Sequence, residues 1–180
     1  MRKITSLRTL KKVILLDLRA RRIMPQWRIL LNPVVRFQLA LRVYEYLINT
    51  RRRGAAALFK LYFRSLSLKL GFSIPPNVFG PGLCIVHYGT IVVSPRARVG
   101  RNCRVHAGVN IGGKAGFYDD KTASRLCTII GSNCYIGPGA KIFGPVVLAA
   151  HCKIGANAVV TRSFLEEKSV LVGVPAQTLK

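Results

Sequence analysis

Residues 129–160 read IIGSNCYIGPGAKIFGPVVLAAHCKIGANAVV, and in this stretch an aliphatic residue returns every six positions. The aliphatic positions are Ile130, Ile136, Ile142, Leu148, Ile154 and Val160. A small or medium uncharged residue follows each of the first five by four positions. A helix buries residues at intervals near 3.6 and a strand at intervals near 2, so neither explains this period. Six-residue repetition is typical of a parallel β-helix, in which each repeat forms one short strand.

The same period continues upstream in two further runs, Phe79, Ile85 and Ile91, and then Val99, Val105 and Ile111. Eight positions separate Ile91 from Val99, which predicts a two-residue bulge at a corner near 94–96. Nineteen positions separate Ile111 from Ile130, the next repeat position. This spacing is one repeat plus thirteen extra residues. These extra residues predict a loop extruded from the coil at about 113–129. The coil is regular except at these two places, where function is usually found.

The repeats predict a mainly β coil over residues 71–180, in which three repeats make one turn and the aliphatic side chains point into a triangular interior. Stacked turns would bury a continuous apolar column. Cys103, Cys134 and Cys152 occupy the small-residue position of their repeats, where a free cysteine serves as a small hydrophobe. We therefore expect free thiols rather than disulfides.

Residues 1–70 differ from the coil in composition. They hold 17 Lys or Arg against Asp17 and Glu45, so 15 of the net charge of +23 lies in this region. Apolar residues alternate with the basic ones at helical spacing, most clearly in residues 35–48. The sequence therefore predicts a set of basic amphipathic helices before the coil.

Two interpretations of these helices remain open. Basic amphipathic helices lie at anionic membrane surfaces, with apolar side chains dipping in and Lys or Arg at the headgroups. Alternatively, the helices pack on the coil and between subunits while their charges stay solvated. No apolar run reaches the roughly 18 residues of a membrane span, and the apolar core of the first segment is too short for a cleaved signal. We expect a cytoplasmic protein, with peripheral contact at the inner face of the cytoplasmic membrane as an option.

Three segments together resemble the hexapeptide-repeat acyltransferases. They are residues 74–113, IPPNVFGPGLCIVHYGTIVVSPRARVGRNCRVHAGVNIGG, the repeats at 129–160, and the closing GVPA at 173–176. Within that family the chain is similar to the serine acetyltransferase branch, and in character to the O-acetyltransferases of bacterial surface polysaccharides. The resemblance covers roughly residues 70–180 and implies a left-handed parallel β-helix, which is an exception to the usual right-handed crossover rule.

His87 is the best candidate for chemistry, because it departs from the repeat pattern two positions after Ile85. In the resembling acetyltransferases a histidine at this place is the general base. An imidazole titrates near neutrality, so it can accept a proton from a hydroxyl and return it to a leaving thiolate. The resemblance therefore implies that His87 activates the acceptor hydroxyl for attack on an acetyl thioester. Backbone N–H groups would stabilise the oxyanion.

Other polar residues have open roles. His106 is expected on the same face as His87, where it contacts substrate, helps to position His87, or is simply solvated. Either a backbone carbonyl or Asp119 or Asp120 of an adjacent subunit's loop would orient His87, and these two carboxylates are equally compatible with solvated loop charges. His151 is assigned by the repeat count to a different face, so the histidines do not converge and no metal is expected.

The departures from serine acetyltransferase concern acceptor binding. That family has an aspartate immediately before its catalytic histidine, where this chain has Val86, and a second orienting carboxylate fifteen positions earlier, where this chain has Phe72. An Arg-His-Pro sequence that ends the family's loop is replaced by residues 126–128, Leu-Cys-Thr. Each loss removes a polar contact to a charged amino acid, which argues against serine as the acceptor.

The donor implied by the resemblance is acetyl-CoA. In the family its pantetheine arm lies along the coils between two subunits, near the positions of Gly113, Pro138 and Ala156. Lys153, Arg162 and Lys180 are candidates for contacts to the CoA phosphates, or ordinary surface charges. A groove between subunits implies a homotrimer, with a hexamer formed through the helices as a further option.

These observations predict an O-acetyltransferase that moves an acetyl group to a hydroxyl of a sugar in a surface polysaccharide, glycolipid or lipid-linked precursor. The first alternative is serine O-acetylation in cysteine biosynthesis. An alternative of another class is a non-catalytic basic scaffold or nucleic-acid-binding protein, but the positive charge lies in amphipathic helices and we find no base-reading motif, so no nucleic acid is expected.

Overall fold

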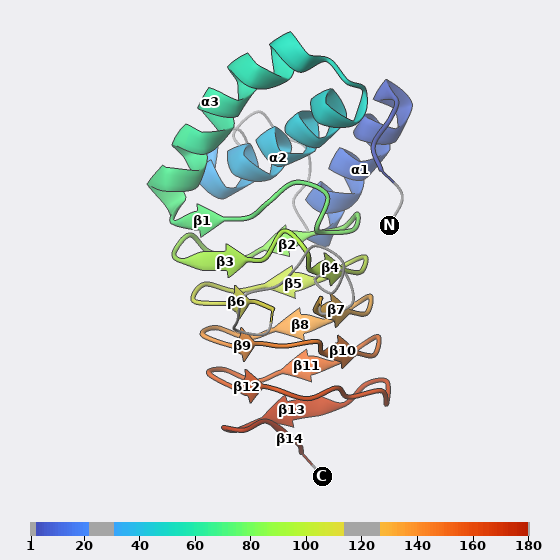
Figure 1. Cartoon of the computed structure of the whole chain (residues 1–180), viewed down its shortest axis with the longest axis vertical. Helices are drawn as coiled ribbons and strands as arrows, with labels where there is room; N and C mark the ends of the chain where they lie inside the picture. Colours follow the sequence, from blue (N-terminus) through green and yellow to red (C-terminus); the bar gives the residue numbers. More distant parts are fainter. Residues whose placement is uncertain (1–2, 22–30, 114–126, 180) are drawn as a thin grey trace, which may run out of the picture.

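The computed structural model describes residues 3–21, 31–113 and 127–179. Three helices come first, α1 (Leu7–Ala20), α2 (Pro33–Asn49) and α3 (Arg53–Leu70), and a stack of short strands follows from Phe72. The helices cover one end of the stack, and the chain then coils away from them to its carboxyl end (Figure 1).

The strands form three parallel sheets, one on each side of the coil. Sheet A joins β1 (Phe72–Ser73), β3 (Ile91–Val93), β6 (Asn110–Ile111), β9 (Lys141–Ile142) and β12 (Val159–Val160). Sheet B joins β4 (Arg98–Val99), β7 (Ile129–Ile130) and β10 (Val147–Leu148). Sheet C joins β2 (Cys84–Ile85), β5 (Arg104–Val105), β8 (Tyr135–Ile136), β11 (Lys153–Ile154), β13 (Val170–Val172) and β14 (Gln177–Thr178). Only the last pair of strands, β13 and β14, is antiparallel in the part of the chain that the structure describes.

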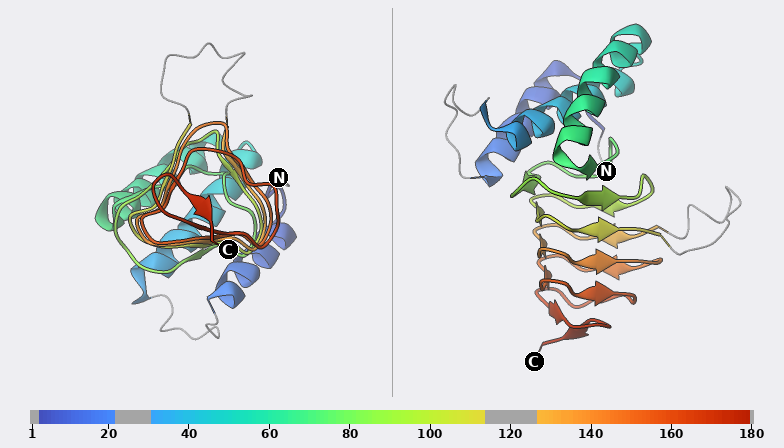
Figure 2. Two further views of the ribbon diagram at one scale, coloured as in Figure 1. Left: turned by 90° about the horizontal axis from the view of Figure 1, so that it is seen from below. Right: turned by 90° about the vertical axis from the view of Figure 1, so that its left-hand side faces the viewer.

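The molecule is therefore a parallel β-solenoid, and the predicted six-residue repeat is confirmed. Viewed along the solenoid axis, successive coils lie over one another around a common interior (Figure 2). The repeat positions fill that interior: Ile85, Val105, Ile136 and Ile154 have no exposed surface. Neighbouring residues point outward, so that Ile129 is 43% exposed while Ile130 is 2% exposed. One apolar column thus holds the coils together.

The first slip in the repeat lies elsewhere than the sequence predicts. Val93, not Ile91, is paired with Ile111, so the six-residue period is intact from Val93 to Val99. The two additional residues lie between Ile85 and Val93, at the corner that contains His87. The prediction of a bulge at 94–96 is wrong because Ile91 and Val93 are both buried and aliphatic, so the sequence pattern fits either register.

Each helix has a recognisable boundary. The side chain of Ser6 accepts a hydrogen bond from the amide of Thr9 at the start of α1. Asn32 caps α2 in the same way, directly before Pro33, which is favoured in the first turn of a helix. Gly71 ends α3 with a φ of 73°, a conformation that glycine adopts without strain.

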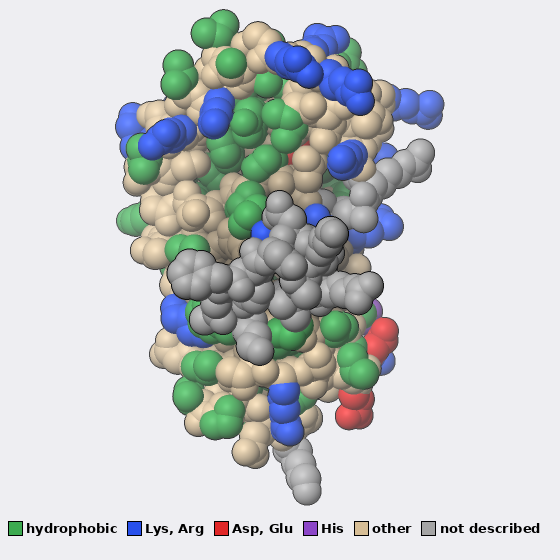
Figure 3. Space-filling model, in the orientation of Figure 1, with side chains coloured by type: hydrophobic (Ala, Val, Ile, Leu, Met, Phe, Trp, Pro, Cys, Tyr) green, Lys and Arg blue, Asp and Glu red, His purple; other side chains and the backbone are tan. Residues whose placement is uncertain are grey.

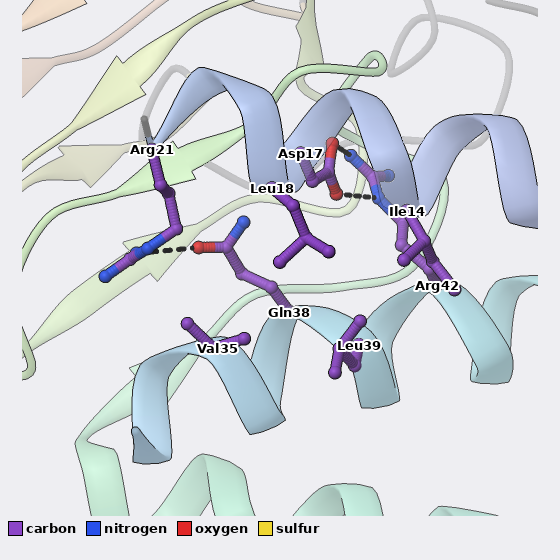
Figure 4. A pocket seen from close by; sticks show the side chains of 8 residues that line it. All are labelled: Ile14, Asp17, Leu18, Arg21, Val35, Gln38, Leu39 and Arg42. Atoms are coloured by element: carbon purple, nitrogen blue, oxygen red, sulfur yellow. Dashed lines mark hydrogen bonds and ion pairs between the residues drawn. The ribbon is translucent and has the colours of Figure 1, made fainter. Parts of the chain in front are cut away.

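The helices are joined to the first coil by aromatic packing and by a buried ion-pair network. The ring of Phe37 in α2 lies 5.3 Å from that of Phe63 in α3 and 4.9 Å from that of Phe72 in β1. Arg42 in α2 is 2% exposed and bonds Asp17 of α1 at 2.8 Å (Figure 4). It also bonds Glu45 at 2.9 Å. These contacts fix α1 and α2 to each other and to the solenoid.

The Arg42 network also reaches the backbone of the first coil. Arg42 donates hydrogen bonds to the carbonyls of Phe79 and Gly80 at 3.0 and 2.8 Å. Asp17 in turn accepts from the amides of Gly82 and Leu83 at 2.7 and 3.0 Å. Burial alone would lower the pKa of Arg42, but the carboxylates of Glu45 and Asp17 hold it above its ordinary value. The charges are therefore paired and hydrogen-bonded, as burial requires.

The surface charge is concentrated as the composition suggests. Lys and Arg side chains are spread over the helical end of the molecule, with hydrophobic side chains between them (Figure 3). Among the described residues, no helix combines the length and the apolarity needed to cross a membrane. The predicted loop at 113–129 falls mostly on residues 114–126, which lie outside the described ranges, and its last residue belongs to β7.

Candidate active site

His87 lies at the corner between sheets C and A, within the two-residue insertion. Tyr88 and Gly89 complete this corner, and Gly89 has a φ of 126°, which only glycine adopts readily. The insertion widens the first coil here relative to the next one. The His87 side chain is exposed, and its ring makes no hydrogen bond to another described residue. A histidine in this setting is accessible to a bound substrate.

His106 lies on the next coil beside His87. Its ring centroid is 6.3 Å from that of His87 and 4.9 Å from that of Tyr135. Partial burial, the neighbouring His87 and the charge of Arg104 lower the pKa of His106 below its ordinary value, so the neutral imidazole is favoured at neutral pH. The expectation that His87 and His106 share one face is in agreement with the register of β2 and β5.

Arg104 and His106 flank Val105, which has no exposed surface. Because side chains alternate along a strand, Arg104 and His106 both point outward on sheet C. Arg104 lies directly between Cys84 and Tyr135 in the strand register. Its guanidinium makes no hydrogen bond or ion pair to another described residue.

Arg21, at the end of α1, reaches the same part of sheet C. Its side chain lies alongside Gln38 of α2 and donates to the Gln38 amide oxygen at 3.0 Å (Figure 4). It also donates to the carbonyl of Ile85, two residues before His87. Burial and the nearby positive charge of Arg104 lower the pKa of Arg21, while Cys84 opposes this. The end of α1 is thereby placed against the coil that carries His87.

The positions where the resembling enzymes have polar groups are apolar or structural here. Phe72 is 4% exposed and belongs to the aromatic core under α2, so it faces away from the site. Val86 lies next to His87 and offers no polar atom in its side chain. The hydroxyl of Thr128 lies 2.6 Å from the carbonyl oxygen of Gly112 and 2.9 Å from that of Gly144, which makes it a backbone support.

The proposed donor contacts are distributed over two corners and one face. Pro138 and Ala156 are exposed and follow His87 in the corner between sheets C and A, on later coils. Lys153 projects from sheet C in register with Tyr135. Gly113 and Arg162 lie at the corner between sheets A and B, where the guanidinium of Arg162 sits 5.2 Å from the ring centroid of Phe164.

Three other candidates lie outside the described ranges: Asp119, Asp120 and Lys180. His151 lies at the corner between sheets B and C, where its ring nitrogen is 3.4 Å from the side-chain amide of Asn133. It is thus on a different corner from His87. In the described ranges, no group of three or more His, Cys, Asp or Glu side chains is arranged to hold a metal ion.

Sequence reasoning missed Arg21, Arg104 and Tyr135 as neighbours of the site. The pattern Arg104-Val105-His106 contained a signal, because the two polar residues flank a buried one and must share the outward face. No signal in the sequence points to Arg21, because it is 64 residues from its carbonyl partner Ile85. Only the docking of α1 brings the two together.

The sequence also matches a known protein family and several known proteins. Residues 127–162 match the bacterial transferase hexapeptide (six repeats) family. The serine acetyltransferase of Mycobacterium tuberculosis is 31% identical over 129 residues, which are 71% of this chain and 54% of that protein. The chain spans about half the length of the curated relatives it matches.

Solved structures share the fold of this chain over about 70% of their own length. Soybean serine acetyltransferase complexed with serine is 26% identical with a TM-score of 0.77, and the match covers 94% of this chain and 69% of that one. A serine acetyltransferase in complex with CoA, 24% identical, has the same fold with a TM-score of 0.76 over 96% of this chain and 71% of that one.

These findings overturn the expected sugar acceptor. The relatives and solved structures reported above are serine acetyltransferases, so the alternative of serine acetylation is the better supported one. The prediction of a sugar acceptor is wrong because the apolar residues Phe72 and Val86 remove contacts to an amino acid but supply none to a sugar. The solenoid and the matched repeats show a hexapeptide-repeat transferase, and the relatives and solved structures to which the chain is similar are serine acetyltransferases.

Proposed function

We propose that the protein is an acetyl-CoA-dependent O-acetyltransferase whose acceptor is the hydroxyl of L-serine. The observation that carries this proposal is the exposed imidazole of His87 at the one widened corner of the first coils. The serine acetyltransferase relatives support both the reaction and the acceptor.

In the proposed reaction, His87 accepts the proton of the serine hydroxyl as that oxygen attacks the thioester carbonyl of acetyl-CoA. A tetrahedral intermediate forms and then collapses with cleavage of the carbon–sulfur bond. His87 returns the proton to the departing CoA thiolate. The products are O-acetylserine and free CoA, and the histidine ends in its starting state.

The donor is proposed to lie along the corner that continues from His87. Pro138 and Ala156 occupy this corner on the following coils, and neither has a long side chain that would fill it. Lys153 projects from the adjoining face, where an ammonium group suits a phosphate of CoA. The solved CoA complex that shares this fold supports the choice of donor.

We also propose a homotrimer. Ile129 and Val147 are paired on the outer face of sheet B and remain 43% and 37% exposed, although both are large and apolar. An exposed apolar strip of this kind is typical of a subunit interface. Light scattering should give three times the chain mass of 19.9 kDa, whereas a single chain mass would contradict the proposal.

Membrane contact is proposed for α3. Leu58, Leu61 and Leu68 are 75%, 69% and 73% exposed, and exposed basic residues lie among them, including Lys60 and Arg64. This combination of apolar and positive groups suits an anionic lipid surface. Flotation with vesicles of anionic lipid should fall sharply in high salt and in a Leu58→Gln, Leu61→Gln variant. Equal flotation of both proteins, or flotation that depends on neither salt nor lipid charge, would contradict it.

The proposed reaction is tested by incubating the protein with acetyl-CoA and L-serine, following thiol release and identifying the product by mass spectrometry. O-acetylserine should form in amounts equal to the thiol released. Thiol release that does not depend on serine, or the absence of the acetylated product, would reject the function.

A further inference from the structure

Two buried nitrogen atoms lack a hydrogen-bond partner among the described side chains: Nε of Arg21 and Nε2 of His106. Buried polar atoms are nearly always paired, because leaving one unpaired costs its desolvation free energy. His106 lies two positions from Arg104 on sheet C, and Arg21, at the end of α1, is close enough to Arg104 for their charges to interact. Because both unpaired nitrogens lie on neighbours of Arg104, one missing partner near Arg104 accounts for both.

The backbone geometry brings these groups together. Arg104 is the register neighbour of Cys84, and the carbonyl of the adjacent Ile85 accepts a hydrogen bond from Arg21. His106 lies two positions beyond Arg104, on the same outward face. We call Arg21, Arg104 and His106 the Arg104 cluster. Each member can donate hydrogen bonds, and the two arginines carry permanent positive charge.

No carboxylate balances this charge in the described part of the chain. The whole sequence has six Asp and Glu residues. Asp17 and Glu45 bond Arg42, and neither forms an ion pair with the cluster. Glu166 and Glu167 are exposed in the last coil, and the remaining two acids lie outside the described ranges. The cluster therefore suits an anion, and it has the wrong sign for an ammonium group.

The position of the cluster relates it to the reaction. The His106 ring lies 6.3 Å from that of His87, so one small molecule can contact both. A hydroxyl and a carboxylate separated by two carbon atoms have the right relationship: the first would reach His87 while the second meets Arg104. Serine has this arrangement, and its ammonium group finds no carboxylate among the described residues around the cluster.

We propose that the Arg104 cluster binds the carboxylate of the acceptor, and that the site selects its acceptor by this carboxylate and not by an ammonium group. The inference rests on the proposed acetyl transfer and narrows its substrate class to small hydroxy acids, of which serine is one. Arginine suits this role because its planar guanidinium can bond both oxygens of a carboxylate.

Two analogues of serine distinguish recognition of its carboxylate from recognition of its ammonium group. 3-Hydroxypropionate lacks only the amino group, and ethanolamine lacks only the carboxylate. We expect kcat/KM for 3-hydroxypropionate to be within about tenfold of that for serine, and that for ethanolamine to be at least about 100-fold lower. Comparable turnover of ethanolamine and 3-hydroxypropionate would overturn the inference.

Substitution of Arg104 gives the second arm. Arg104→Gln should raise KM about 10- to 100-fold for serine and 3-hydroxypropionate, with kcat changed by less than about threefold and ethanolamine turnover unaffected. Arg101→Gln, at an exposed position on another corner of the same coil, is the matched control and should change neither constant. An unchanged KM for serine in Arg104→Gln would also overturn the inference.

A binding measurement does not depend on turnover. The ring resonances of His106 should shift saturably on titration with 3-hydroxypropionate in the absence of acetyl-CoA, and the shift should be lost in Arg104→Gln but kept in Arg101→Gln. Such binding without acetyl transfer to any acceptor would reject the proposed reaction while supporting the carboxylate site. The absence of a saturable shift in the unsubstituted protein would reject the site itself.

Discussion

The ring centroids of His87 and His106 lie 6.3 Å apart on neighbouring coils of the solenoid. The pair results from the register of β2 and β5, in which Ile85 is opposite Val105. His87 is exposed and His106 is partly buried against Tyr135, so two residues of one type have different surroundings. This difference suits proton transfer by the first and ligand contact by the second.

Inward-facing and outward-facing strand residues should respond very differently to truncation. Ile130→Ala should lower the free energy of unfolding by about 2–5 kcal/mol, because it leaves a cavity in the apolar column. Val92→Ala, at an outward-facing position of β3 that is 37% exposed, should cost clearly less. Urea unfolding of both variants at one protein concentration tests this, and equal losses would contradict the observed register.

The buried ion-pair network of Arg42, Asp17 and Glu45 should contribute strongly to the stability of the protein. Arg42→Ala should cost about 3–5 kcal/mol, since it leaves the carboxylates of Asp17 and Glu45 buried without a cation. Arg36→Ala, on the exposed side of the same helix, is the control and should change stability by less than about 0.5 kcal/mol. Thermal and urea unfolding would reveal a loss no larger than the control if Arg42 carried no structural role.

The pKa of His106 should lie below 6.5 in the folded protein. The unfolded state then binds more protons near this pH, so the contribution of His106 to stability is present above about pH 6.5 and is lost as the pH falls through the folded pKa. NMR titration of the imidazole carbons measures it. Removing the positive charge in Arg104→Gln should raise this pKa, while burial keeps it below 6.5. A pKa that does not respond to Arg104→Gln would contradict the proposed proximity.

The sequence predicts the solenoid well because a six-residue period is set by local geometry. Each buried position, from Ile130 to Val160, is determined by its own repeat and by the coils on either side. The corner at His87 was harder to place, since Ile91 and Val93 are both buried and either could continue the repeat. Pairing between strands, which a single sequence does not display, decides between them.

The candidate site was predictable only in part. His87 and His106 follow from counting along the repeats, because both lie within the coil. Arg21 does not, since its position depends on how α1 docks through Asp17 and Arg42. The acceptor was also assigned wrongly, because the absence of a carboxylate at Val86 and Phe72 describes what the site lacks and not what it binds.

The most direct test of the central claim is the kcat/KM for serine-dependent CoA release in His87→Ala, compared with the unsubstituted protein and with His151→Ala. His151 is a matched control, because it is an exposed histidine on another corner of the same solenoid. We expect His87→Ala to lose activity by about 100- to 10,000-fold while His151→Ala stays within about threefold. Activity of His87→Ala within a few-fold of the unsubstituted protein, with the fold intact by circular dichroism, would contradict the assignment of His87 as the general base.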